Sequence, residues 1–425
     1  MTKKEYCCSY SLFKGNLENP VYKNLVSKTD QITVGLFMLW ALILPWSLAG
    51  MQIIMVLLVL TSIVINLIHR RPPIIYHPIY FFMALYLLMS IITVLTTDDM
   101  YIAMRSAFNN DWVILCVPFI ASIYLPEKWK KNILIALLIS ATISGLYGII
   151  QFFVGVDYIR NIPLGLLGRF YRATGGYSSF FAFGGNQLFV FSFAYVFVLF
   201  SPQEKRINKF YLFSAIVILL GIIGSQTRSA WLGMIIVILL GTFIKSKKYF
   251  VYGILILIVS SIIMFLFLPD IQDRFSSIFD ASKNEGRLNI WRTSWIMFKN
   301  NWLVGIGHGN FDFYFEKFKV PGFYDAGGHA HNDYLNVAVL NGILGLITWL
   351  GMWITWFYYA IRSYRLPERT DLEKIILLSA MLGVGGILIA AFFQCYYTDL
   401  ENNIFWWFMA ASSLLVLNRE KKRVI

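Results

Sequence analysis

Two histidines near the end of a polar stretch have the residue type and placement for proton-transfer chemistry. His329 and His331 stand in the run Gly-Gly-His-Ala-His-Asn-Asp, directly before an apolar helix that begins near residue 333. An imidazole gains and loses a proton near neutral pH, so a histidine at such a border is a candidate base. The alternative is that both are ordinary loop histidines, and this stretch alone favours neither interpretation.

Arginines at the edges of apolar segments suggest a second kind of chemistry. Arg228 opens one apolar segment, and Arg172 lies in a glycine-rich stretch that leads into another. Arg169 and Arg287 are further arginines that we place on the same side of the protein. A helix N terminus favours anions, and guanidinium matches phosphate oxygens in a bidentate fork, so the set suits a diphosphate. Taken singly, each could be an ordinary loop charge, or, for Arg228, a side chain that snorkels to lipid headgroups.

A metal site is the competing interpretation of the polar cluster. Histidines two residues apart do not share a helical face, and the His-Glu-x-x-His spacing of metalloproteases is absent. The sequence also lacks the Asp-x-Asp pair that usually carries magnesium in nucleotide-sugar transferases. We therefore expect no metal and no cofactor. The candidate ligands of such a site are His308, Asp325, His329, His331 and Asp333.

Membrane helices are the elements that must position these residues. The 425 residues are 58% hydrophobic and 14% charged, whereas soluble domains are roughly 45–50% apolar and about 25% charged. Many apolar runs of about 20 residues predict an all-α polytopic membrane protein, with residues 1–425 as a single integral membrane domain. We expect about twelve spans, at 31–48, 51–69, 79–97, 110–125, 133–154, 179–200, 209–225, 229–245, 249–268, 333–361, 374–395 and 402–418.

The basic residues orient these spans. Twelve spans put both termini on one side, and 24 of the 36 Lys and Arg residues fall on that side. We therefore expect a cytoplasmic N-terminal segment 1–30, a cytoplasmic tail 419–425, and an outer loop 269–332 between the ninth and tenth spans. The net charge of +13 does not indicate nucleic-acid binding, because the basic residues form short clusters between the spans.

Part of the long loop has a helical pattern of its own. Residues 287–303 carry apolar side chains at 288, 291, 295, 298 and 302, which form one helical stripe. Three of these are tryptophans, which suit the membrane–water boundary. We expect a helix that lies flat on the outer leaflet, or, alternatively, one that packs on the spans through the same tryptophans.

With these residues in hand, the sequence resembles the bacterial O-antigen ligase and polymerase superfamily. The resemblance covers roughly residues 160–350, and the flanking spans only by hydropathy. The Arg-x3-Leu motif of the ligases is matched by Arg228-Ser-Ala-Trp-Leu232, and His-[Asn/Ser/Gln]-x9-Gly by His331-Asn332 with Gly342. A run of the form Arg…Trp…Pro-Leu-Gly-x-Gly is matched from Arg287 to Gly307, except that Trp302-Leu303-Val304 stands where a proline is common.

The resemblance implies an enzyme of defined chemistry. It implies an O-antigen ligase, a metal-independent inverting glycosyltransferase that moves a glycan from undecaprenyl diphosphate to a hydroxyl of lipid A–core. The reaction would take place on the periplasmic face of the bacterial inner membrane, in contact with membrane lipid. His331 would be the catalytic base, because it aligns with the motif, with support from His329 and Asn332. The diphosphate would be bound by Arg172, Arg228 and Arg287, with support from Arg169.

Three other functions stay open from the sequence. An O-antigen or exopolysaccharide polymerase would use the same donor with a second lipid-linked glycan as acceptor. A periplasmic protein glycosyltransferase would usually carry a larger C-terminal extension than this sequence has. A transporter or flippase fits the span count, but we find no internal repeat, and the polar residues crowd on one face.

Overall fold

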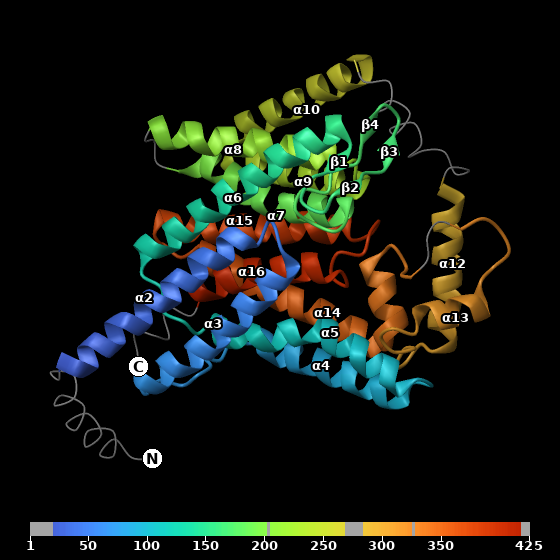
Figure 1. The fold of residues 1–425 in the computed structure, drawn as a ribbon, viewed down its shortest axis with the longest axis horizontal. Helices are drawn as coiled ribbons and strands as arrows, with labels where there is room; N and C mark the ends of the chain where they lie inside the picture. Colours follow the sequence, from blue (N-terminus) through green and yellow to red (C-terminus); the bar gives the residue numbers. More distant parts are fainter. Residues whose placement is uncertain (1–19, 202–204, 268–283, 325–327, 418–425) are drawn as a thin grey trace.

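The computed structural model describes residues 20–201, 205–267, 284–324 and 328–417, and most of these residues are helical. The predicted all-α class is confirmed. Of the predicted segments, 1–19, 269–283, 325–327 and the tail 419–425 lie outside the described residues. The helices shown in Figure 1 are α2 (Pro20–Ile43), α3 (Leu48–Ile68), α4 (Ile79–Thr96), α5 (Met100–Ile120), α6 (Glu127–Val154), α7 (Phe180–Phe200), α8 (Lys205–Gly224), α9 (Arg228–Lys245), α10 (Lys247–Phe267), α12 (Glu285–Asn300), α13 (Phe311–Phe318), α14 (Asp333–Tyr364), α15 (Asp371–Ala390) and α16 (Leu400–Leu417).

A long helix overlaps each of the twelve predicted spans. In the described part of the chain, seven helices are long and apolar enough to cross a membrane: α3, α4, α6, α7, α9, α14 and α15. Shorter apolar helical stretches occupy Gln31–Ile43 and Asn208–Gly224. The polytopic membrane class is therefore confirmed, and twelve crossings stay a prediction.

Several predicted boundaries were wrong by five residues or more. α2 runs from Pro20 to Ile43 rather than 31–48, and α6 begins at Glu127 rather than near residue 133. α5 begins at Met100 rather than near residue 110, because the Asp99 carboxylate accepts the Ile102 N–H and caps the helix there. α15 ends at Ala390 rather than near 395. The residues from 391 to 399, here called the 391–399 segment, are not helical and lead to α16.

The core lies where three helices meet in the middle of the molecule. Figure 1 shows α7, α15 and α16 between α3–α5 on one side and α8–α10 on the other. Tryptophans pack where α14 meets α16, since the Trp353 ring lies 5.3 Å from that of Trp406 and 5.2 Å from that of Trp407. Such packing holds helices together in a bilayer, where hydrophobic burial contributes little to their association.

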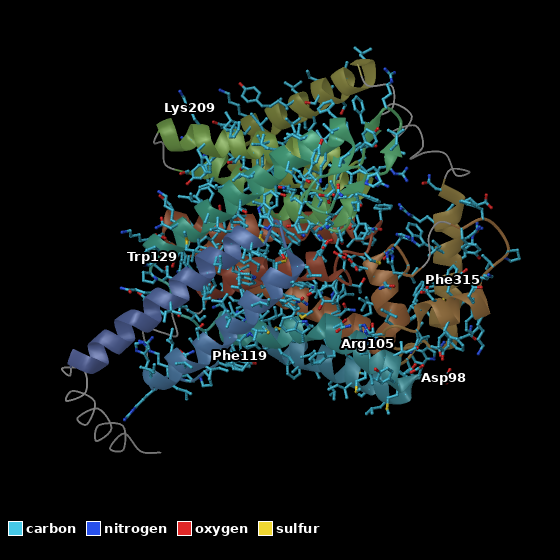
Figure 2. The ribbon with its side chains drawn as sticks, in the orientation of Figure 1. Asp98, Arg105, Phe119, Trp129, Lys209 and Phe315 are labelled. Atoms are coloured by element: carbon cyan, nitrogen blue, oxygen red, sulfur yellow. The ribbon has the colours of Figure 1, made fainter. Side chains whose placement is uncertain are left out.

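The two ends of the bundle differ in what they carry. α2 begins and α16 ends at one end, while α12 and α13 lie at the opposite end (Figure 1). In Figure 2, Asp98, Arg105 and Phe315 lie at the end with α12 and α13, and Trp129 and Lys209 lie at the other end. Because successive spans cross in opposite directions, the predicted outer loops must lie at one end of the bundle and the predicted lysine-rich loops at the other. Which end faces the cytoplasm stays a prediction.

α12 occupies the part of the long loop where a helix was expected, and Figure 1 shows it lying crosswise to the bundle. Its most buried face is formed by small, polar and two larger apolar residues: Gly286, Asn289, Ile290, Thr293, Ser294 and Met297. Trp295 and Trp302 of the predicted stripe are 52% and 56% exposed. Leu288, Trp291 and Phe298 of the stripe are half-buried, and the Trp291 ring lies 6.3 Å from that of Phe393. The stripe is thus partly packed on the protein and partly exposed, and its contact with the outer leaflet stays a prediction.

Two small hairpins fill the connection between α6 and α7. β1 (Val156–Asp157) pairs with β2 (Ile162–Pro163), and β3 (Leu166–Leu167) pairs with β4 (Phe170–Tyr171), both antiparallel. Arg160 donates to the Asp157 carboxylate at 3.1 Å and to the Gly176 carbonyl at 2.7 Å. This arginine therefore fastens the first hairpin to the turn that precedes α7.

α14 is broken at Gly342, where φ is +67° and ψ is −173°. The chain that follows α12 passes through this break, backbone against backbone. Ile343 N–H donates to the Trp302 carbonyl at 2.7 Å, and Gly307 N–H donates to the Leu340 carbonyl at 3.0 Å. A Cβ on Gly342 would lie 2.2 Å from the Leu303 oxygen, so only glycine fits. The two glycine-containing motifs of the sequence thus meet at one crossing.

Gly342→Ala is expected to destabilise the protein by about 2 kcal/mol or more, because it combines a positive φ with a backbone clash. Thermal unfolding of the purified protein in detergent measures the effect. Gly35→Ala is the matched control, since a Cβ at Gly35 meets nothing within 4 Å. Equal unfolding temperatures for the two variants would contradict the role given to Gly342.

Candidate active site

The predicted site residues lie at the beginnings of helices. Arg228 is the first residue of α9, and Arg287 lies in the first turn of α12. The Arg172 guanidinium carbon lies 3.1 Å from the ring centroid of Phe180, the first residue of α7. His331 comes two residues before α14. Each cationic side chain is therefore added to the positive end of a helix dipole.

The N-terminal ends of α9 and α12, here called their heads, are in contact. Arg228 Nη2 donates to Asn284 Oδ1 at 3.4 Å, and Asn284 is the N-cap of α12. Neither Asn284 nor Thr227, the N-cap of α9, makes a side-chain capping bond to its own helix. The first-turn N–H groups of a helix have no partner within the helix, so two uncapped heads with two arginines form an arrangement suited to anions.

The head of α7 joins the same junction. The Thr227 hydroxyl donates to the Phe180 carbonyl at 3.3 Å, which places Arg172, stacked on Phe180, beside the head of α9. Arg169 differs, because it lies in the turn of the β3–β4 hairpin and is exposed. The structure therefore brings Arg172 and Arg228 to adjoining helix heads and leaves Arg169 on an exposed turn.

The two histidines lie against each other, with ring centroids 4.2 Å apart. His331 has the left-handed backbone conformation, with φ +48°, and its N–H donates to His329 Nδ1 at 3.2 Å. On its other side, His331 Nδ1 lies 2.8 Å from Gln394 Oε1. Both rings thus have one nitrogen engaged by a specific partner.

These contacts separate the two histidines, which spacing in the sequence could not do. Burial, then His331 and Arg287, lower the pKa of His329 to about 4. His329 is therefore neutral near pH 7, with its Nδ1 lone pair occupied by a backbone N–H, and is a weak base. Ile290 of α12 and Ala330, which stands between the two histidines, belong to one buried apolar cluster, so the start of α12 packs beside the histidines.

A buried carboxylate joins the head of α14 to the 391–399 segment. Asp333 Oδ2 accepts the N–H groups of Tyr396 at 2.8 Å and Tyr397 at 2.9 Å. The Tyr396 hydroxyl in turn lies 2.8 Å from the Ser229 hydroxyl, next to Arg228. Asn332 caps α14 by accepting the Leu335 N–H at 3.0 Å, and its predicted support of the chemistry stays a prediction.

Sequence reasoning missed the 391–399 segment as part of the site. Gln394 and Tyr396 are almost fully buried, and burial followed by the nearby Glu401 raises the pKa of Asp399 to about 8. The sequence predicts this segment as the end of one span and a short loop before the next. Its polar residues lie between two predicted spans on the same side as His331, and that placement could have identified them.

The residues considered as metal ligands are drawn into other contacts. His308 is buried with its Nε2 3.8 Å from Asp111 Oδ2, and Asp333 binds backbone N–H groups. Asp325 lies outside the described residues. The structure therefore brings His329 and His331 together and engages His308 and Asp333 elsewhere.

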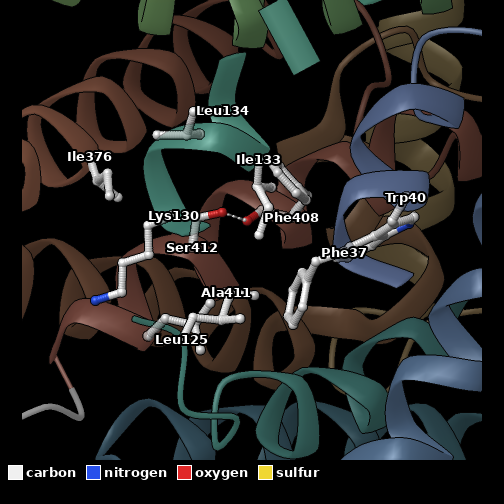
Figure 3. A pocket seen from close by; sticks show the side chains of 11 residues that line it. Phe37, Trp40, Leu125, Lys130, Ile133, Leu134, Ile376, Phe408, Ala411 and Ser412 are labelled. Atoms are coloured by element: carbon white, nitrogen blue, oxygen red, sulfur yellow. Dashed lines mark hydrogen bonds between the residues drawn. The ribbon is translucent and has the colours of Figure 1, made fainter. Parts of the chain in front are cut away.

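A pocket at the opposite end of the molecule is unrelated to this arrangement. Figure 3 shows its apolar side chains, among them Phe37, Trp40 and Phe408. Lys130 lies at the same pocket, with its Nζ 3.9 Å from Glu373. The pocket contains none of the predicted site residues.

Comparison with known families agrees with these motifs. Residues 213–350 match the O-antigen ligase family. The matched region includes Arg228, Arg287, His329 and His331, and it confirms the resemblance predicted from the sequence. It supports a membrane enzyme of the O-antigen ligase or polymerase type. A search of curated protein sequences finds no match.

Protonation of His329 is expected to destabilise the folded protein. Because its folded pKa of about 4 is below the ordinary value of 6.5, its stabilising contribution is present above pH 6.5 and is lost as pH falls towards 4. Unfolding temperatures of the wild type and His329→Gln, measured across this range, are expected to converge or cross as the pH falls. Parallel curves would contradict the lowered pKa.

Proposed function

We propose that the protein is an O-antigen ligase. It transfers a glycan from undecaprenyl diphosphate to a sugar hydroxyl of lipid A–core, on the periplasmic face of the inner membrane. The observation that carries the proposal is the gathering of Arg172, Arg228 and Arg287 at the heads of α7, α9 and α12. The head of α12 packs beside the pair of histidines that precedes α14, and Tyr396 links the head of α9 to Asp333.

The proposed reaction is a direct displacement. His331 removes the proton of the acceptor hydroxyl, and the oxygen then attacks the anomeric carbon of the donor sugar. The bond from that carbon to the diphosphate oxygen breaks, and undecaprenyl diphosphate leaves with the bonding electrons. A single displacement inverts the anomeric configuration. A well-placed general base contributes about 10²–10⁴-fold to such a step.

The arginines act on the leaving group. Negative charge builds up on the diphosphate as the glycosidic bond breaks, and guanidinium groups already in place stabilise it without reorganisation. The uncapped heads of α9 and α12 add positive dipole ends at the same place. The proposal therefore includes no metal or cofactor, because these groups supply the required positive charge.

The proposed orientation has both termini in the cytoplasm. It is supported by the 24 Lys and Arg residues on the side of the termini, and by α2 and α16 lying with their chain ends at the end opposite α12 (Figure 1). A donor already on the outer face needs no nucleotide, which suits a compartment without ATP.

Deletion of the gene tests the function. We expect loss of all long-chain bands from the lipopolysaccharide gel, with polymerised glycan accumulating on undecaprenyl diphosphate. Complementation with the wild type restores the bands, and His331→Ala does not, at equal protein level. A single repeat still attached to core would indicate the polymerase instead, and an unchanged profile would indicate another glycan or a transport role.

Arg287→Ala is expected to lower the transfer rate about 10²-fold or more, because one preorganised charge donor is removed. Arg292→Ala is the matched control on the same helix: Arg292 is exposed and contacts Asn289 at 3.2 Å, so its loss is expected to change the rate less than about threefold. The measurement is transfer from purified lipid-linked glycan by the protein in detergent. Equal losses in both variants would refute the assignment of Arg287.

A further inference from the structure

We propose that Gln394 is a positioning residue that fixes the tautomer and the ring orientation of His331. The inference rests on the proposed role of His331 as the base. It assigns a function to a residue outside the matched region 213–350 and outside the motifs of the sequence. Gln394 comes from the 391–399 segment, 63 residues further along the chain.

The contact determines which ring nitrogen carries the proton. Gln394 Oε1 lies 2.8 Å from His331 Nδ1, and an amide oxygen can only accept a hydrogen bond. Neutral His331 therefore carries its proton on Nδ1, and the basic lone pair is on Nε2. A base that must take a proton from a substrate needs this lone pair fixed in one direction, because the other tautomer presents an N–H instead.

Gln394 is itself held in place. Its side chain is 7% exposed, so its amide has little freedom to rotate away. The segment around it is fastened on both sides, since Asp333 N–H donates to the Ala391 carbonyl at 2.9 Å and Asp333 Oδ2 accepts from Tyr396 and Tyr397. Asn336 Nδ2 also donates to the Thr398 hydroxyl at 3.3 Å. The acceptor oxygen is thus fixed by the same helix head that presents His331.

An amide orients the ring without adding a charge to it. A carboxylate in the same place would hold the same tautomer, but it would also stabilise the imidazolium and raise the pKa of His331. This difference makes the proposal testable. Among the described residues, the charged and titratable groups around His331 include His329 beside it, Arg287 on α12, Asp333 on α14, and Cys395, Tyr396 and Asp399 on the 391–399 segment.

The first experiment does not depend on activity. Diethyl pyrocarbonate reacts with the unprotonated imidazole, so its reaction with His331, followed by peptide mass spectrometry across the neutral range, gives the midpoint of protonation. In the full-length protein, Gln394→Glu is expected to move this midpoint up by about 1 unit or more. Gln394→Leu removes the acceptor without adding a charge, so it is the control and is not expected to raise the midpoint. An unmoved midpoint in Gln394→Glu would overturn the proposal.

The second experiment measures transfer from lipid-linked glycan. Gln394→Leu is expected to lower kcat about 10- to 100-fold, within the total effect of a general base, with little change in the KM of the donor. Gln394→Glu is expected to recover most of the rate at high pH and to lose it at a higher pH than the wild type. Full activity of Gln394→Leu would also overturn the proposal.

The two proposals fail in different ways. Undiminished transfer by His331→Ala would refute the proposed function. The midpoint of His331 protonation in Gln394→Glu would still show whether the side chain at position 394 acts on the His331 ring. Loss of transfer in His331→Ala, combined with an unmoved midpoint in Gln394→Glu, would refute only the role of Gln394.

Discussion

Asp333 is fully buried at the head of α14, and its carboxylate binds the 391–399 segment through two backbone N–H groups. Leaving those buried N–H groups without an acceptor would cost about 1–3 kcal/mol each. Through this one side chain, the end of α15, the start of α16 and the head of α14 become a single unit. Tyr396 extends the unit to Ser229 on α9, beside Arg228. The relative positions of histidine and arginine therefore depend on a residue that takes no part in the proposed reaction.

The site is assembled from helix beginnings rather than from a folded loop domain. α7, α9, α12 and α14 all present their N-terminal ends to the junction, although they are far apart in the sequence. Such ends are electropositive whatever their sequence, and arginine at three of them reinforces the field. The same arrangement would be costly at the middle of a bilayer, where charged side chains are poorly solvated. Its position at the end of the bundle, beside the crosswise α12, avoids much of that cost (Figure 1).

The sequence predicted the features that depend on local pattern. Apolar runs located the helices, and the three-four spacing located α12. Motif order predicted the family, which the match over residues 213–350 supports, while the roles of Arg228 and His331 stay predictions. Features that depend on distant contacts were not predictable in this way. Phe392 and Phe393 extend the apolar run of α15, so the turn after Ala390 is visible only once Asp333 is seen to bind its N–H groups. The hairpin fastened by Arg160 was missed for the same reason.

The break at Gly342 gives the spacing of the histidine motif a geometric meaning. A half-helix of nine residues, from Asp333 to Asn341, lies between Asn332 and Gly342. The crossing chain anchors its C-terminal end, and its N-terminal head carries Asp333 next to His331. Each helical residue turns the head by about 100° and moves it by about 1.5 Å. One inserted residue would therefore rotate Asp333 and His331 by more than a quarter turn away from Gln394. The length of this spacer sets the rotation of the head about the helix axis, while Asp333 and Asn336 within it fasten the head to the 391–399 segment.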